Sequence, residues 1–440
     1  MALNPGVFPW LAGVLLTGEG AARLLRLEAG PPSERLSRNY GLGLIVTSLS
    51  LFYLTLLGVP LVLSTLLGLA AFWSVLGFRF GKRPPAAPQL PLTWAGRGLL
   101  GITGLIGLVV LAISLAGPET SLDGRTHWGM CARMLFYDRG VWGDTYWEPA
   151  RLFPHRSYPL LVPLGEWSLF AYCGDCDARS VKALFALVWW AQVGLLWGQL
   201  RRMHKPGLAA GLLLLWAGLP FPALCSDGGA ISGYSDICLT LLVTGGFIAI
   251  LRRSPEELAM WAAGALFCKR EGIPLVGLGL LLLLLSRERR QWWRSAALVA
   301  LLTTPWWIFV HILPDDHLGV GSVSERITTW ALANWGPHNL LRMAHQYWFE
   351  PETWDFFWWT ALAAILSPRR WNGTAMMSSL FILGYACVIL MVFLPVSPET
   401  YDWDTVNRCA MPLTGPALVF IASRFPRSLT EGPPGVSEAP

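Results

Sequence analysis

The chain has 440 residues, of which 54% are hydrophobic and 14% are charged. Water-soluble domains carry about 25% charged residues, so this composition excludes an ordinary soluble fold. The formal net charge is +5, and Lys and Arg concentrate in short segments between apolar runs, where basic residues set the orientation of membrane proteins. The positive charge therefore indicates membrane topology, and no nucleic-acid partner is expected.

Apolar runs recur along the whole chain, and several approach the roughly 20 residues that cross about 30 Å of hydrocarbon. In lipid, only helices and closed barrels give every backbone N–H and C=O group a hydrogen-bond partner. The pattern predicts an all-α polytopic bundle with about 11–13 transmembrane or re-entrant helices. The predicted segments are 7–25, 41–58, 60–80, 98–117, 159–173, 178–200, 207–224, 230–251, 257–285, 296–313, 354–367, 373–395 and 409–424.

Basic residues at the segment ends predict which ends face the cytosol. They leave three longer segments outside, at 118–158, 314–353 and 396–408. We expect residues 1–97 to form N-terminal transmembrane helices and a Pro-rich cytoplasmic linker. Residues 98–424 would form the main membrane module, and 425–440, rich in Pro, Gly, Ser and Glu, a disordered tail.

Two segments do not fit a simple crossing. Placing Arg83 and Arg201 on one side requires an even number of crossings between them, so the short segment 159–173, with Pro159 and Pro163, is predicted to be re-entrant or broken. The run 257–285 is interrupted by Lys-Arg-Glu and is predicted to form a hairpin with its charged corner at the external face.

The first external segment contains a predicted amphipathic helix from Thr126 to Arg139, closed by Gly140. Its apolar residues recur at helical spacing, at Trp128, Cys131, Met134 and Leu135. Such a helix is expected to lie in the plane of the membrane interface.

Asp123 stands just before this helix, with His127 one turn further along. A carboxylate in this position could take the proton from an acceptor hydroxyl, because a neutral alcohol is a poor nucleophile. Asp is also a favoured helix N-cap, so both roles remain open for Asp123.

Lys269, Arg270 and Glu271 form a second group of candidates, because charges inside apolar segments are costly and mark functional sites. Two cations at the outer end of broken helices could hold a phosphate, or the three residues could form an ion-paired turn. Arg408, before the last segment, is a third candidate or an ordinary interfacial Arg. Asp227 and Asp236, near another helix start, could face a polar cavity or cap the helix.

Other motifs give no support for a different chemistry. Cys173 and Cys176 form an isolated Cys-x-x-Cys with no second pair, so no metal site is inferred. No nucleotide-binding glycine loop, Gly-x-Ser-x-Gly elbow or His-Glu-x-x-His motif is present in a credible context.

The chain resembles the GT-C superfamily of integral-membrane glycosyltransferases, a group that includes protein mannosyltransferases and aminoarabinose transferases. The resemblance covers about residues 98–424 and consists of an ordered series of motifs. They are SLDGRTHWGMCARML, PHRSYPLLVPLGEW, GYSDICLTLL, CKREGIPL and VNRCAMPL. The chain departs from many relatives by having Gly124 after Asp123 where they have a second acid, and by its N-terminal helices.

The resemblance implies transfer of a sugar from a polyprenyl-phosphate donor to a hydroxyl of a lipid, glycan or protein acceptor. It implies that Asp123 is the catalytic base. The substrate-binding candidates are His127, His155, Arg156, Lys269, Arg270, Glu271 and Arg408. Dependence on a divalent cation stays open. The expected location is the bacterial inner membrane, with the site facing the periplasm; a lipid or solute transporter is the alternative function, and an inactive membrane scaffold is the third.

Overall fold

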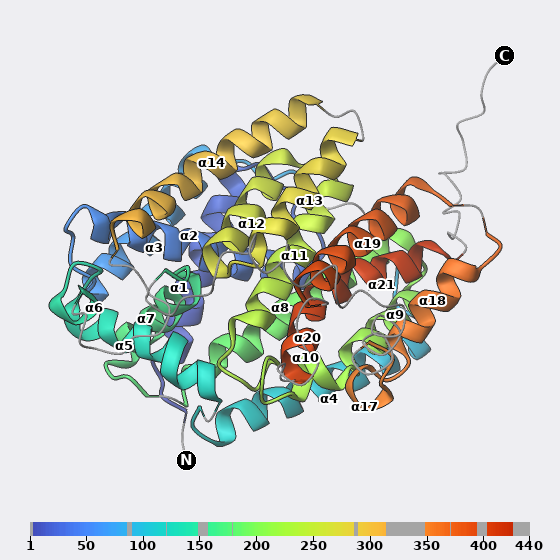
Figure 1. Cartoon of the computed structure of the whole chain (residues 1–440), viewed down its shortest axis with the longest axis horizontal. Coiled ribbons are helices and arrows are strands. Elements are labelled where there is room, and N and C mark those ends of the chain that lie inside the picture. The colour runs from blue at the N-terminus through green and yellow to red at the C-terminus, as the bar shows by residue number, and fades with distance from the viewer. Residues whose placement is uncertain are drawn as a thin grey trace, which may run out of the picture.

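The computed structural model describes residues 3–85, 90–119, 121–147, 157–177, 179–285, 289–313, 348–369, 371–393 and 403–425. Every regular element in these ranges is a helix, as predicted. Figure 1 shows the N-terminal helices at one side of the bundle, helices of the middle of the chain at its centre and the C-terminal helices at the other side.

The N-terminal helices are α1 (Val7–Leu24), α2 (Pro32–Leu56) and α3 (Leu63–Phe80). Helix α2 begins at Pro32, nine residues before the predicted segment 41–58, so the prediction placed its start too late. Its first turns carry Arg35 and Arg38, which resemble loop residues in the sequence. They are accommodated because acidic side chains pair with both of them, Glu19 with Arg35 and Glu34 with Arg38.

The next helices are α4 (Trp94–Ala116), α7 (Leu161–Cys173) and α8 (Lys182–Met203). Helix α7 has 13 residues, about 20 Å at 1.5 Å per residue, which is shorter than the roughly 30 Å of hydrocarbon. Its last residue accepts a hydrogen bond from Asn4, before α1, at 3.3 Å. The start of α8 lies beside the end of α4, because Lys182 donates to the Gly117 carbonyl at 3.4 Å. The prediction that 159–173 does not span stays a prediction.

The central helices are α9 (Pro206–Ala217), α10 (Pro220–Leu224), α11 (Ser235–Leu251), α12 (Pro255–Cys268), α13 (Gly272–Leu285) and α14 (Arg289–Ile312). The predicted hairpin is confirmed, since α12 and α13 are separated only by Lys269, Arg270 and Glu271. The predicted segment 207–224 is divided into α9 and α10, because Pro220 starts a new helix.

The C-terminal part contains α17 (Pro351–Trp354), α18 (Phe357–Leu366), α19 (Gly373–Phe393), α20 (Trp403–Ala410) and α21 (Thr414–Ser423). A 3-10 turn, Met411–Leu413, joins α20 to α21. Arg408 therefore lies inside a helix, and the last predicted external segment, 396–408, is helical from Trp403 onward.

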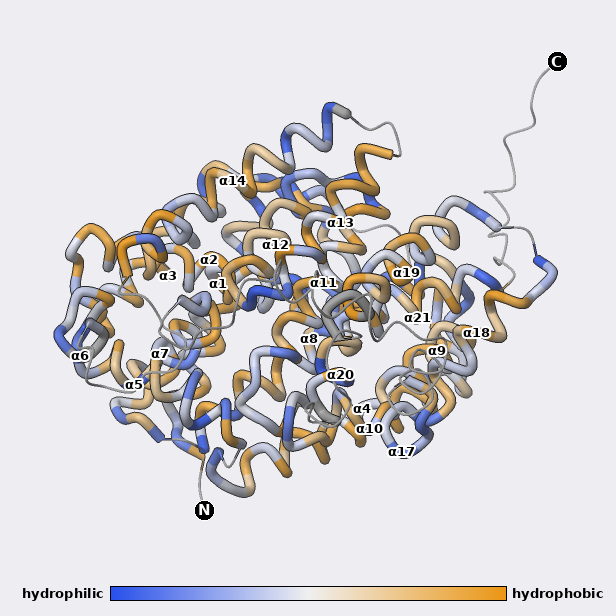
Figure 2. Tube along the Cα trace, in the orientation of Figure 1, coloured by the Kyte–Doolittle hydropathy of each residue, from blue (hydrophilic) through white to orange (hydrophobic). Residues whose placement is uncertain are grey.

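Five helices in the described ranges are long and apolar enough to cross a membrane: Pro32–Leu56, Leu63–Phe80, Trp94–Ala116, Lys182–Met203 and Arg290–Ile312. Shorter apolar helices of 10–17 residues accompany them. Figure 2 shows hydrophobic residues along most helices and hydrophilic residues mainly near their ends. The chain is thus a polytopic helical membrane protein.

Several predictions concern residues outside the described ranges. They are the middle of the linker at 86–89, most of the second external segment at 314–347, the stretch 394–402 and the tail at 426–440.

One end of the bundle carries a buried charge network, here called the Glu34 network, formed by Glu34, Arg38, Arg202, Arg252 and Glu257. Glu34 is fully buried and its carboxylate contacts Arg252 at 2.6 Å, Arg38 at 3.8 Å and also Arg202. Arg38 reaches Glu257 at 3.8 Å. The network joins α2, α8, α11 and α12. Three of them, α2, α8 and α11, contribute the basic residues Arg38, Arg202 and Arg252, which were predicted to share one side, and the common location of these residues agrees with that prediction.

Replacing Glu34 with Gln should strongly destabilise the protein. Removal of one partner from a buried ion pair costs roughly 3–5 kcal/mol, and here several guanidinium groups would lose the same carboxylate. The free energy of unfolding of the full chain in detergent measures the effect. Glu28→Gln is the matched control, because Glu28 also contacts Arg202 but its side chain is 40% exposed; equal stability of the two variants would contradict the account.

Candidate active site

The amphipathic helix of the first external segment is present as a π-helical turn, η1 (Gly124–Trp128), followed by α5 (Gly129–Asp138) and, further on, α6 (Asp144–Trp147). Its predicted apolar face is confirmed. Trp128, Cys131, Met134 and Leu135 are all buried. The helix ends at Arg139, which adopts a left-handed conformation with φ of 56°, one residue before the predicted Gly140.

Asp123 does not cap this helix. Its backbone is already helical, and its side chain makes no capping hydrogen bond, so the capping alternative is wrong. Instead, Oδ2 of Asp123 accepts a hydrogen bond from Arg408 at 3.2 Å. The Asp123 side chain is 45% exposed and that of Arg408 is 16% exposed, so the carboxylate is held by a partly buried cation and remains accessible from outside.

Arg408 is held in place by its surroundings on α20. Its guanidinium lies over the ring of Tyr234, 4.7 Å from the centroid. The aliphatic part of Arg408 passes Gly228, where an added Cβ would come within 2.8 Å of Cγ and where φ is +132°. Only glycine tolerates both the conformation and the close approach, so this turn fixes the position of Arg408.

Tyr234 links the two sides of this arrangement. Its hydroxyl donates to Asp227 at 3.3 Å and accepts from the backbone N–H of Asp123 at 3.5 Å. Burial and the nearby Asp123 carboxylate raise the pKa of Tyr234 above its ordinary value, so the hydroxyl stays protonated and acts as a donor. Asp227 thus positions Tyr234.

A buried ion pair lies beside Arg408. Nζ of Lys269 is 2.7 Å from Oδ1 of Asp236 and 3.3 Å from Oε1 of Glu271. Asp236 is 2% exposed and Lys269 is 9% exposed. Burial opposes the charge on Lys269, but the carboxylates of Asp236 and Glu271 outweigh it and raise the Lys269 pKa well above its usual range.

These groups form one site, here called the Asp123 cluster, which comprises Asp123, Tyr234, Asp236, Lys269, Glu271 and Arg408. Arg408 connects its two halves. Burial would lower the pKa of Arg408, yet the carboxylates of Asp236 and Asp123 raise it. In the described residues, Nε of Arg408, Oδ2 of Asp236 and Oε2 of Glu271 are buried without a hydrogen-bond partner. Unsatisfied buried polar atoms of this kind are expected at a binding site.

Arg270 occupies the rim of the cluster. It is exposed, donates a hydrogen bond to the Ser157 hydroxyl and lies 5.0 Å from the centroid of the Tyr158 ring. Tyr158 also packs edge-on against His127, with the ring centroids 5.0 Å apart. The sequence candidates His127 and Arg270 are therefore brought together through Tyr158. His155 and Arg156 lie outside the described residues.

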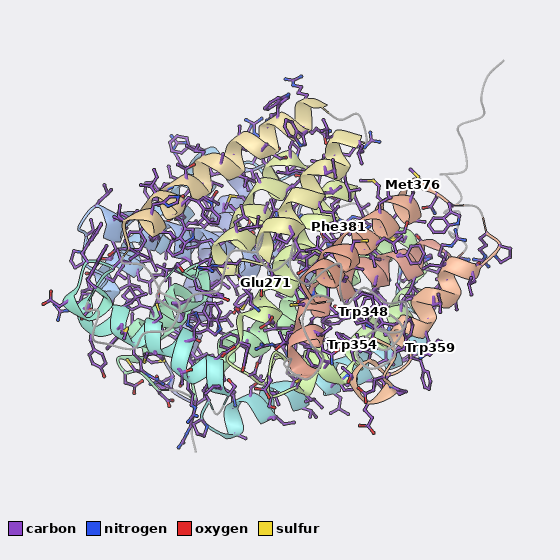
Figure 3. All side chains as sticks on the ribbon, viewed as in Figure 1. Glu271, Trp348, Trp354, Trp359, Met376 and Phe381 are labelled. Carbon is purple, nitrogen blue, oxygen red and sulfur yellow. The ribbon has the colours of Figure 1, made fainter. Side chains whose placement is uncertain are left out.

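The sequence did not identify Tyr234 or Trp354 as part of this region. Trp354 is fully buried and its indole N–H donates to Oδ1 of Asn407, the neighbour of Arg408, at 3.1 Å. Figure 3 places Trp354 and Trp348 near each other, to the lower right of Glu271. Tyr234 belongs to the Gly-Tyr-Ser-Asp motif, which was the available signal, whereas nothing distinguished Trp354 among 24 tryptophans.

Within the described ranges, no group of three or more His, Cys, Asp or Glu side chains is arranged to hold a metal ion. Comparisons of the chain with protein-family models, curated proteins and solved structures give no match. The function therefore has to be inferred from the chemistry of the cluster.

Replacing Lys269 with Met should lower the free energy of unfolding by about 3–5 kcal/mol, because Asp236 would keep a buried, unpaired charge. The loss should be the same between about pH 6 and pH 9. The folded-state pKa of Lys269 is raised above its ordinary 10.5, so its stabilisation is complete below that value and is lost only as the pH rises through the folded-state pKa.

Unfolding of the wild type and the variant in detergent at both pH values provides the measurement. Asp236→Asn in the Lys269→Met background should restore part of the loss. A loss that shrinks at the higher pH would show that Lys269 is not held as a cation.

Proposed function

We propose that the protein is a membrane glycosyltransferase that moves a sugar from a polyprenyl-phosphate donor to an acceptor hydroxyl. One observation carries the proposal. The accessible carboxylate of Asp123 is held through one oxygen by Arg408, and it lies beside the turn between the short helices α12 and α13, which carries the cation of Lys269. It combines a base with phosphate-binding groups at one end of a bundle of apolar helices.

Asp123 supports the role of general base. Arg408 binds Oδ2 and thereby orients the carboxylate, and Oδ1 is directed by no hydrogen bond within the described residues. Oδ1 takes the proton of the acceptor hydroxyl as the acceptor oxygen attacks the anomeric carbon of the donor sugar. The bond from that carbon to the phosphate oxygen breaks, and the electron pair leaves with the polyprenyl phosphate.

Arg270 is the best-placed residue to bind the donor phosphate. Lys269 and Arg408 are already neutralised by carboxylates. Arg270 is exposed at the rim, and within the described residues it contacts the hydroxyl of Ser157 and the ring of Tyr158. A guanidinium in this state can bind a phosphate through two parallel hydrogen bonds without first giving up a carboxylate partner.

The proposal includes the following partners. The donor is a membrane lipid and reaches the cluster laterally from the bilayer, and the acceptor is a hydroxyl of a lipid, glycan or protein. The Asp123 cluster lies at the opposite end of α11 from Arg252, a basic residue that favours the cytosolic side. We therefore place the site at the external face, which in a bacterial inner membrane is the periplasmic face.

A transporter is the second candidate, and the buried pair of Asp236 and Lys269 at the turn between two short helices favours it, because transporters use such sites for binding. Incubation of the purified chain with labelled polyprenyl-phosphate sugars separates the two functions. A transferase releases free polyprenyl phosphate in the presence of acceptor, whereas a transporter in vesicles moves its substrate unchanged across the membrane. If neither transfer nor transport is detected, the protein is an inactive scaffold.

Asp123→Asn should reduce sugar transfer by about 10²–10⁴-fold, the usual contribution of a general base, while leaving the protein folded. Turnover of a labelled donor in vesicles is the measurement. Asp175→Asn is the matched control, because Asp175 is an exposed acid that accepts a hydrogen bond from the backbone N–H of Asp177. Unchanged turnover of Asp123→Asn would remove Asp123 from the mechanism.

Arg270→Gln should raise the KM for the donor by about tenfold, because a charged hydrogen bond to the phosphate is lost, and should change kcat much less. Initial rates over a range of donor concentrations measure both parameters. Arg290→Gln, which removes an exposed Arg at the start of α14, should leave both unchanged. A fall in kcat at constant KM would contradict a role in donor binding.

A further inference from the structure

An apolar groove opens between α1, α2, α4 and α8, away from the Asp123 cluster. Its volume is about 540 Å³, within the roughly 300–1,000 Å³ of pockets that hold small molecules. The lining is almost entirely apolar and includes Leu15, Leu36, Leu100, Trp190 and Trp197. A groove of this shape and polarity suits a hydrocarbon chain.

The groove ends at the basic end of the bundle. Ser33 and Ser37 line it, and they flank Glu34, the central carboxylate of the Glu34 network. Trp197 also lines it, and the Arg201 guanidinium lies 5.2 Å from the centroid of one Trp197 ring. One end of the apolar groove is therefore next to a guanidinium group.

The guanidinium of Arg201 has N–H groups that can donate to a further hydrogen-bond acceptor. Its Nη2 donates to the Leu90 carbonyl, but its Nε and Nη1 are buried and have no hydrogen-bond partner in the described residues. Arg97 is exposed on α4 and lies three residues before Leu100, on the same helical face. Arg97 and Arg201 form no ion pair with a carboxylate of the described residues, whereas the nearby carboxylates of Glu34 and Glu28 are already paired with other arginines.

We infer that this groove binds an anionic phospholipid, with one acyl chain between α1, α2, α4 and α8 and the phosphate at Arg97 and Arg201. The charge complementarity selects this occupant, because the phosphate of a zwitterionic lipid is already compensated by the cation of its own headgroup, whereas an anionic lipid brings a net negative charge to the two arginines. The site lies in the leaflet opposite the Asp123 cluster and does not depend on the transferase proposal. Such a lipid would fix the N-terminal helices against α4 and α8.

Native mass spectrometry of the full, delipidated chain in detergent tests this inference. The probes are phosphatidylglycerol and phosphatidylcholine with identical acyl chains. Each basic residue contributes to the attraction of an anionic lipid, so the wild type should bind phosphatidylglycerol roughly tenfold more tightly. Arg97→Gln combined with Arg201→Gln should abolish the difference, and Arg79→Gln, at an exposed residue of α3 outside the groove, should preserve it.

A second pair of variants tests the acyl-chain part without changing charge. Gly104 lines the groove, and an added Cβ there meets nothing within 4 Å, so Gly104→Phe should fill the groove and reduce binding of both lipids. Gly101 has equally open surroundings but does not line the groove, so Gly101→Phe should bind lipid as the wild type does. Equal affinity of the wild type for both lipids, or undiminished binding by Gly104→Phe, would overturn the inference.

Discussion

The ion pair between Lys269 and Asp236 is the interaction on which the geometry of the candidate site depends. It joins the first turn of α11 to the turn between α12 and α13 at 2.7 Å, and both partners are buried. Buried charges are tolerated only when they are paired and hydrogen-bonded. The pair therefore determines where the charged corner lies, and through Asp236 it also helps to hold the cation of Arg408 next to Asp123.

The molecule separates two polar regions along its apolar helices. Helix α11 has 17 residues, about 25 Å at 1.5 Å per residue, and it carries Asp236 in its first turn and Arg252 at its end. The Asp123 cluster and the Glu34 network thus lie about one hydrocarbon thickness apart. The two regions also differ in access. The Glu34 carboxylate is fully buried and shared by three arginines, whereas Asp123 and Arg270 are open to a substrate.

The sequence predicted the features that follow from the free-energy cost of placing adjacent charged residues in an apolar segment. Three adjacent charges in an apolar run predicted the α12–α13 hairpin, which is confirmed, whereas the non-crossing of 159–173 stays a prediction. The start of α2 was placed too late because Arg38 resembles a loop residue. The burial of Arg38 is compensated by Glu34, four residues earlier on the same helix, and also by the distant Glu257. Whether a charge can be buried also depends on residues far away in the chain, and a single sequence does not show which distant residues are in contact.

The candidate site was predicted in its components but not in its contacts. Asp123 and Arg408 were identified separately, and they are 285 positions apart, so no local pattern relates them. The structure rules out the capping role of Asp123, because its side chain makes no capping hydrogen bond and binds Arg408 instead; its role as a base stays a prediction. Tyr234 and Trp354 were not selected, because aromatic residues are common at the ends of membrane helices for reasons unrelated to a site.

Electron cryomicroscopy of the protein in lipid nanodiscs with a bound polyprenyl-phosphate sugar is the most direct test of the account. We predict density for the phosphate against Arg270 and for the sugar facing Asp123, at the end of the bundle opposite the Glu34 network. Phosphate density at the opposite end, or Asp123 and Lys269 facing different sides of the membrane, would contradict it.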